Sequence, residues 1–187
     1  MLSPVLIAAT SPLLAYREAV HIVAGFAGIV CLALLLIQPL LAARYLPGLD
    51  PMEQRTWHRR VGAGIILCVA LHVGGLFAAS PADALDALLL VSPTPFSVYG
   101  VMAMWGVVLT AVLVALRGRL GIRYSVWRLI HNGLALVVVV ATVVHAVQIE
   151  GAMEAISKWL LCIAALLATV LTLLHLRVIR PLTQRRR

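Results

Sequence analysis

Four histidines form a repeated pattern that could bind metal ions. His58 and His72 lie fourteen positions apart in one apolar stretch, and His131 and His145 lie fourteen apart in another. If both stretches are α-helices, fourteen residues rise about 21 Å and bring the side chain back to within about 40° of its starting direction. Each stretch therefore presents two imidazoles on one face, at two heights.

Such imidazoles suit the two axial positions of a haem iron. If the stretches run in the same direction and face each other, His58 pairs with His131 and His72 pairs with His145. Two pairs would hold two haems one above the other, so that electrons could pass from iron to iron. A single intramembrane histidine is more simply explained as a packed side chain bonded to a backbone carbonyl. Four histidines at matched spacing favour haem binding.

The composition places these stretches in a membrane. Hydrophobic residues make up 63% of the 187 residues and charged residues 12%, a balance that excludes an ordinary soluble domain. The net charge of +8 comes from basic residues at the ends of apolar segments, which indicates membrane orientation and not nucleic-acid binding. Cys31, Cys68 and Cys162 fall inside apolar runs without paired spacing, so we expect small buried side chains.

The expected fold is an all-α integral membrane protein, a bundle of five transmembrane helices with the haems between spans two and four. A bilayer leaves no other backbone structure for such long Leu, Val and Ala runs. The predicted spans are 19–43, 57–79, 97–116, 127–148 and 155–178. We expect residues 1–16 to form an interfacial segment or a short sixth helix, 17–180 the di-haem transmembrane domain, and 181–187 a basic cytoplasmic tail.

The basic residues predict the orientation. Arginines follow the first, third and fifth spans, whereas the other connections are mainly acidic, with Asp83, Asp86, Glu150 and Glu154. The positive-inside rule then places the N-terminus outside and the C-terminus in the cytoplasm, as for a multi-pass protein of a bacterial inner (plasma) membrane. Spans two and four consequently run in the same direction.

The chain resembles the ferric reductase-like transmembrane family, which includes ferric reductases, the membrane domain of NADPH oxidases and the haem subunit of a periplasmic methionine sulfoxide reductase system. WHRRVGAGIILCVALH and WRLIHNGLALVVVVATVVH carry the resemblance, which covers roughly residues 19–178. It implies two b-type haems with His58, His72, His131 and His145 as axial ligands, and transmembrane electron transfer to an external acceptor such as a ferric chelate or a periplasmic reductase.

The flavin and nicotinamide domain of many family members is not recognisable, and the chain has no Gly-rich dinucleotide fingerprint. We therefore expect a separate cytoplasmic flavoprotein or a quinol as electron donor, and an electron-transfer component of an oxidoreductase. Two other hypotheses remain open. One is a haem-binding accessory subunit of a larger membrane complex. The other is a proton or metal transporter, although the spans lack a midplane acid.

Other residues have less specific interpretations. Small residues near the histidines could leave room for a macrocycle or serve helix packing; they are Gly62, Gly64, Gly74, Gly75, Gly133, Ala135 and Ala141. The pair His58 and His131 is expected near the cytoplasm and would hold the inner haem. Four arginines could neutralise the propionates of this inner haem or serve topology alone; they are Arg59, Arg60, Arg123 and Arg128. Trp57 and Trp127 fit interfacial anchors. We expect packing or an interfacial position for His21, and snorkelling towards the headgroups for His175.

Overall fold

Every regular element of the protein is helical in the part of the chain described by the structure. This computed structural model describes residues 6, 8–15, 17–179 and 182. The elements are a 3₁₀ turn η1 (Pro12–Leu14), α2 (Ala19–Ala43), α3 (Pro51–Ala79), α4 (Pro81–Leu88), α5 (Pro95–Ala115), α6 (Tyr124–Gln148), α7 (Ala155–Leu174) and a π-helical turn η2 (His175–Ile179). Five of the helices (α2, α3, α5, α6 and α7) are long and apolar enough to cross a membrane, as predicted.

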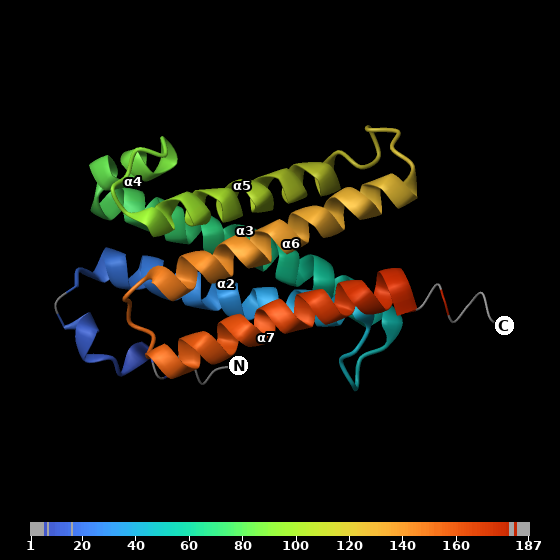
Figure 1. Cartoon of the computed structure of the whole chain (residues 1–187), viewed down its shortest axis with the longest axis horizontal. Coiled ribbons are helices and arrows are strands. Elements are labelled where there is room, and N and C mark those ends of the chain that lie inside the picture. The colour runs from blue at the N-terminus through green and yellow to red at the C-terminus, as the bar shows by residue number, and fades with distance from the viewer. Residues whose placement is uncertain (1–5, 7, 16, 180–181, 183–187) are drawn as a thin grey trace.

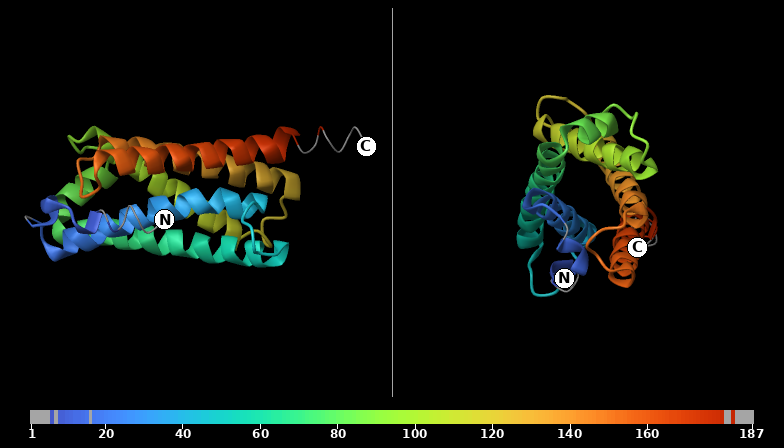
Figure 2. Two further views of the ribbon diagram at one scale, coloured as in Figure 1. Left: turned by 90° about the horizontal axis from the view of Figure 1, so that it is seen from below. Right: turned by 90° about the vertical axis from the view of Figure 1, so that its left-hand side faces the viewer.

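The five long helices run side by side and form a ring (Figures 1 and 2). In this ring α2 packs against α3 and α7, α6 packs against α5 and α7, and contacts between α3 and α5 close it. The histidine-bearing helices α3 and α6 are therefore not neighbours. Their facing sides are separated by the interior of the ring, so side chains from both helices can meet there.

The start of α3 differs from the prediction, which placed residues 51–56 in a connection. Asp50 caps the helix by accepting hydrogen bonds from the backbone N–H groups of Met52 and Glu53, while the Glu53 side chain accepts from the Asp50 N–H. This capping box satisfies donors that a helix end otherwise leaves free, and Pro51 suits the first helical position. The helix therefore begins six residues before Trp57.

Two other segments add to the predicted outline. The connection between the second and third spans contains α4, which begins at Pro81 and is followed by a loop to α5. Of the predicted interfacial segment 1–16, the described residues contain η1, and the search of the described residues finds five candidate spans and no sixth. Apart from Leu182, the predicted basic tail 181–187 lies outside the described residues.

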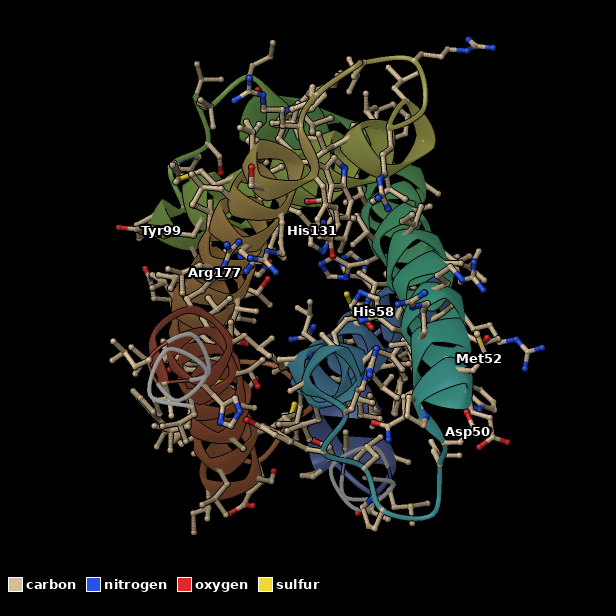
Figure 3. The ribbon with its side chains drawn as sticks, turned by 90° about the vertical axis from the view of Figure 1, so that its right-hand side faces the viewer. Asp50, Met52, His58, Tyr99, His131 and Arg177 are labelled. Carbon is tan, nitrogen blue, oxygen red and sulfur yellow. The ribbon has the colours of Figure 1, made fainter. Side chains whose placement is uncertain are left out.

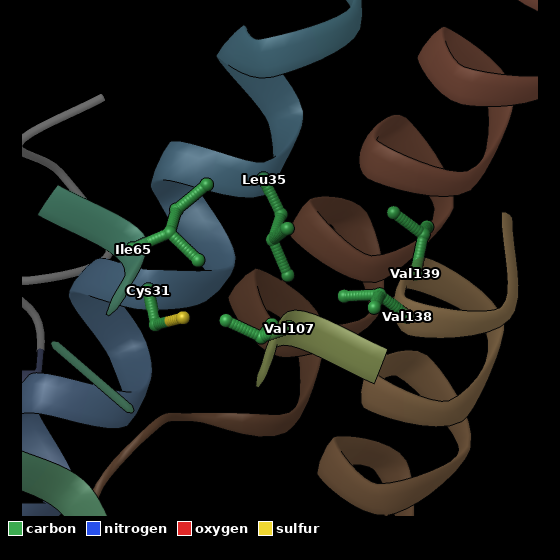
Figure 4. Close-up of a cluster of buried hydrophobic side chains, with 6 residues drawn as sticks. All are labelled: Cys31, Leu35, Ile65, Val107, Val138 and Val139. Carbon is green, nitrogen blue, oxygen red and sulfur yellow. The ribbon is translucent and has the colours of Figure 1, made fainter. Parts of the chain in front are cut away.

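A buried apolar cluster occupies the middle of the ring. It joins side chains from α2, α3, α5 and α6 (Figure 4): Cys31, Leu35, Ile65, Val107, Val138 and Val139. Ile65 lies seven residues from each histidine of α3, and Val138 lies seven residues from each histidine of α6. Because seven residues are about two helical turns, the cluster lies midway between the two histidine levels. Cys31 and Cys162 are buried, as predicted, whereas Cys68 is only partly buried; all three are free.

Candidate functional site

The structure brings the four histidines together in the two expected pairs. The ring centres of His58 and His131 are 6.4 Å apart, and those of His72 and His145 are also 6.4 Å apart. The planes cross at 68° in the first pair and 80° in the second. Figure 3 shows His58 and His131 pointing towards one another from α3 and α6. Since each pair joins residues at the same step along the two helices, α3 and α6 run in the same direction.

The ring separation fits a metal ion held between two imidazoles. A metal–nitrogen bond is about 2.0 Å long and each nitrogen lies about 1.2 Å from its ring centre, so two ligands on opposite sides of one metal have centres about 6.4 Å apart. Both pairs match this value. Within the described residues, no group of three or more His, Cys, Asp or Glu side chains is placed to hold a metal ion. The four histidines are thus grouped two by two.

Three of the four rings are oriented by backbone carbonyls of the neighbouring helix. The Nδ1 atoms of His58, His72 and His145 lie 3.2, 2.7 and 2.8 Å from the carbonyl oxygens of Gln38, Ala24 and Phe96, respectively. A carbonyl only accepts, so these contacts require a proton on Nδ1 and leave Nε2 with its lone pair. Metal-binding histidines usually donate a hydrogen bond of this kind from the ring nitrogen that does not bind the metal. Sequence reasoning missed these partners because they depend on the register between helices.

The fourth ring, that of His131, has different surroundings. Its Nδ1 atom is buried and has no hydrogen-bond partner among the described residues. The ring instead lies flat against Trp127, with centres 5.1 Å apart and planes 8° apart. Trp127 was predicted as an interfacial anchor, but it also forms part of the site. A Trp one helical turn before the histidine was the available signal.

Two glycines leave space for the rings of His72 and His145. A Cβ atom on Gly100 would lie 2.7 Å from Cε1 of His145, and one on Gly28 would lie 3.1 Å from Nδ1 of His72. Neither glycine was predicted. Of the glycines that were, Gly74 and Gly133 have nothing within 4 Å of the point where a Cβ would lie, and Gly75 packs against Ala24. The contact of Gly75 supports the helix-packing interpretation.

The two helical hairpins that form the site repeat each other. Residues of α2 and their equivalents in α5 differ by 72 positions, and those of α3 and α6 differ by 73: Ala24 and Phe96, Gly28 and Gly100, His58 and His131, His72 and His145. At the level of His72 and His145, the α2–α3 and α5–α6 hairpins thus each contribute the same set of groups: a carbonyl acceptor, a glycine and a histidine. The constant offset between the two hairpins could have identified Gly28 and Gly100 from the sequence.

The four predicted arginines are close in sequence to His58 or His131. They therefore lie at the same end of the ring of helices as these two histidines. All four are exposed. The Arg60 guanidinium lies 5.2 Å from the centre of the Trp57 ring, and that of Arg128 lies 5.6 Å from the Tyr124 ring. Arg177 of η2, which sequence reasoning did not select, donates to the Arg128 carbonyl at 2.8 Å. This end of the ring is therefore strongly basic.

The two remaining histidines lie outside the pairs. His175 begins the π-helical turn and contacts Tyr45 edge to face, with ring centres 5.5 Å apart. His21 is half-buried in the first turn of α2. Neither ring is paired with another histidine among the contacts of the described residues.

The ring of five long apolar helices defines a multi-pass membrane protein with paired imidazoles in its interior. The family of ferric reductase-like transmembrane components matches residues 24–142, and the chain belongs to this family. The match includes His58, His72 and His131 and ends three residues before His145. No curated protein and no solved structure matches the chain.

Proposed function

We propose that the protein is a di-haem b-type cytochrome, the membrane subunit of a ferric reductase-like oxidoreductase. The observation that carries the proposal is the geometry of the two histidine pairs, each with ring centres 6.4 Å apart. Three of the four rings also have the carbonyl partner that leaves Nε2 free for a metal. Family membership supports the same conclusion independently.

In this proposal His58 and His131 hold the inner haem, and His72 and His145 hold the outer haem. The haem irons supply a reversible one-electron change between the ferric and ferrous states. The carbonyls of Ala24 and Phe96 keep the outer imidazoles in the tautomer that can bind iron. The buried cluster around Ile65 and Val138 keeps water out of the space between the two levels, which maintains a low dielectric there.

The proposed direction of transfer is from the cytoplasm to the outside of a bacterial inner membrane. It rests on the arginines at the His58 and His131 end, because basic residues are retained on the cytoplasmic side. The donor would be a separate cytoplasmic flavoprotein or a quinol, and the acceptor would lie outside. Arg59, Arg60, Arg123 and Arg128 are proposed to pair with the propionates of the inner haem, since guanidinium groups bind carboxylates through charge-assisted hydrogen bonds.

A pyridine haemochrome assay on detergent-purified full-length protein tests the proposal. We expect two b-type haems per chain and a reduced-minus-oxidised spectrum typical of low-spin haem. One haem per chain would show that one of the histidine pairs does not bind haem. Protein that contains no haem, even when it is produced with excess haem precursor, would refute the proposed function.

A matched control separates ligation from a general effect of removing a histidine. His175→Ala changes a half-buried imidazole that contacts Tyr45 and lies outside both pairs. We expect this variant to keep both haems, whereas His145→Ala should lose one. Equal haem loss in the two variants would contradict the assignment of the ligands.

A further inference from the structure

The inner and outer pairs differ in how the ligand on α6 is oriented. In α2, the two carbonyls that accept from histidines of α3 belong to Ala24 and Gln38, fourteen residues apart. In α5, the carbonyl of Phe96 accepts from His145, so the corresponding acceptor for His131 would be that of Thr110. This bond is not formed, since Nδ1 of His131 has no partner among the described residues.

Trp127 is the aromatic side chain that contacts His131 at this position. Its indole face lies against His131 with the planes 8° apart, and its Nε1–H group donates to the Leu113 carbonyl of α5 at 3.4 Å. The indole also has two further contacts: the Arg117 guanidinium lies 4.6 Å from its centre and Tyr124 stacks at 6.1 Å. Thus α5 is connected to His131 through the Trp127 ring and not through a direct hydrogen bond.

We propose that Trp127 is a positioning residue for His131, and that the missing carbonyl bond gives the inner haem a more positive midpoint potential than the outer haem. This inference rests on the proposed function, because it assumes that both pairs bind haem. It adds that the two haem sites have different midpoint potentials and that residues of α5 and α6 cause the difference.

The sign of the difference follows from the hydrogen bond. An imidazole whose Nδ1–H donates to a carbonyl is a more basic ligand and stabilises ferric iron more than ferrous iron. His72 and His145 both have this bond, whereas in the inner pair only His58 has it, at the longer distance of 3.2 Å. The positive charge of Arg117 near Trp127 also raises the midpoint potential of the inner haem, because a nearby positive charge favours the reduced state of the iron.

The consequence concerns the order of the electron-transfer steps. A more positive inner haem is reduced readily by a donor at the basic end of the ring. The onward step to the outer haem is then the less favourable one, so the external acceptor must draw electrons outwards. His58, Trp127 and His131 would determine the free energy of the first electron-transfer step, and the outer histidines that of the second.

A spectroscopic redox titration of the purified protein tests the proposal. We expect two one-electron waves, and His72→Ala should retain the more positive wave. Loss of an orienting hydrogen bond weakens metal binding about 10–100-fold. If ferric binding is weakened about tenfold more than ferrous binding, the waves should be separated by about 59 mV for a one-electron couple.

Variants of Trp127 test the positioning role directly. Trp127→Leu should convert the inner haem from low-spin to high-spin, seen by electron paramagnetic resonance, while the outer haem stays low-spin. Trp127→Phe retains a flat ring and should restore the low-spin signal. Trp57→Leu is the matched control, since Trp57 precedes His58 by one residue and its ring contacts Arg60; both haems should stay low-spin.

The outcomes distinguish this inference from the proposed function. Wild-type protein without haem would overturn both. Two haems with equal potentials, or a more positive wave that disappears in His72→Ala, would overturn the inference and leave the cytochrome intact. An unchanged inner signal in Trp127→Leu, or the same change in Trp57→Leu, would refute the role of Trp127.

Discussion

A single methyl group added at Gly100 should displace His145 and release the outer haem. The added Cβ would lie 2.7 Å from Cε1 and 2.8 Å from Nδ1 of the His145 ring, whereas ordinary van der Waals contact begins at 3.4 Å. The ring must therefore move by about 0.7 Å, the difference between 3.4 and 2.7 Å. Metal–ligand distances in working sites stay within about 0.2 Å of their usual length, so a ring displaced this far no longer binds the iron well.

The energetic cost at Gly100 should leave the protein folded. Overpacking a filled site costs about 1–3 kcal/mol, and replacing a helical glycine with alanine recovers up to about 1 kcal/mol. The expected loss of stability is thus at most about 3 kcal/mol by these values, while haem affinity at the outer site should fall about 10–100-fold, as for the loss of an orienting contact.

The assay is the haem content and low-spin spectrum of purified Gly100→Ala. Gly28→Ala is a graded comparison, because its Cβ would lie 3.1 Å from His72 and require a smaller movement. Gly74→Ala, with nothing within 4 Å, is the control and should keep both haems. If Gly100→Ala binds two haems as tightly as Gly74→Ala does, the packing argument for the outer pair is wrong.

Four other predictions address the ligands, the fold and the orientation. His72→Ala should lose the outer haem and keep the inner one, as measured by haem per chain; equal loss of both would contradict the pairing. Gln54→Ala should lower the thermal midpoint through loss of about 1–3 kcal/mol, because the buried Gln54 amide donates to the carbonyls of Leu46 and Leu49; the exposed Gln148→Ala should have little effect. Protein prepared with depleted haem should melt at a lower temperature than the loaded form, since a ligand that binds only the folded state stabilises it; identical melting would argue against binding between the two hairpins. In a background without native cysteines, an impermeant maleimide added to intact cells should label Ala82→Cys and not Arg119→Cys, and the reverse pattern would invert the proposed orientation.

Much of the fold could be predicted from the sequence because hydropathy and spacing act locally. The fourteen-residue spacing on two spans was sufficient to place His58 opposite His131 and His72 opposite His145, once both spans ran in the same direction. The start of α3 was wrong because the capping box of Asp50 and Glu53 extends the helix beyond the apolar stretch, and hydropathy alone does not detect it. The short helix α4 was missed because it is too short to cross a membrane and lies in a connection.

The groups around the histidines were harder to predict because they belong to other helices. Which carbonyl faces His72 depends on how far α2 is shifted along α3, and this register is fixed by close contacts such as Gly75 against Ala24. The contact of Trp127 with His131 was local and available, but the position of Trp127 at a helix start favoured the anchor interpretation. The sequence pattern of a helix identifies which of its faces is buried. Which residue of another helix contacts that face is decided only by the packing of the helices.

The fifth span explains how two separate hairpins can hold rings at a fixed distance. Since α3 and α6 are not neighbours, their spacing depends on the contacts that join the two hairpins: α3 contacts α5 directly, and α7 packs against α2 on one side and α6 on the other. Its interface with α2 contains Cys162 and Ala165, both 0% exposed, and small side chains allow helices to approach closely in a membrane. At the far end of the span, Arg177 bonds to the carbonyl of Arg128, three residues before His131. Thus α7, which lies beyond the family match, joins the two hairpins on the side of the ring of helices opposite the direct contact between α3 and α5.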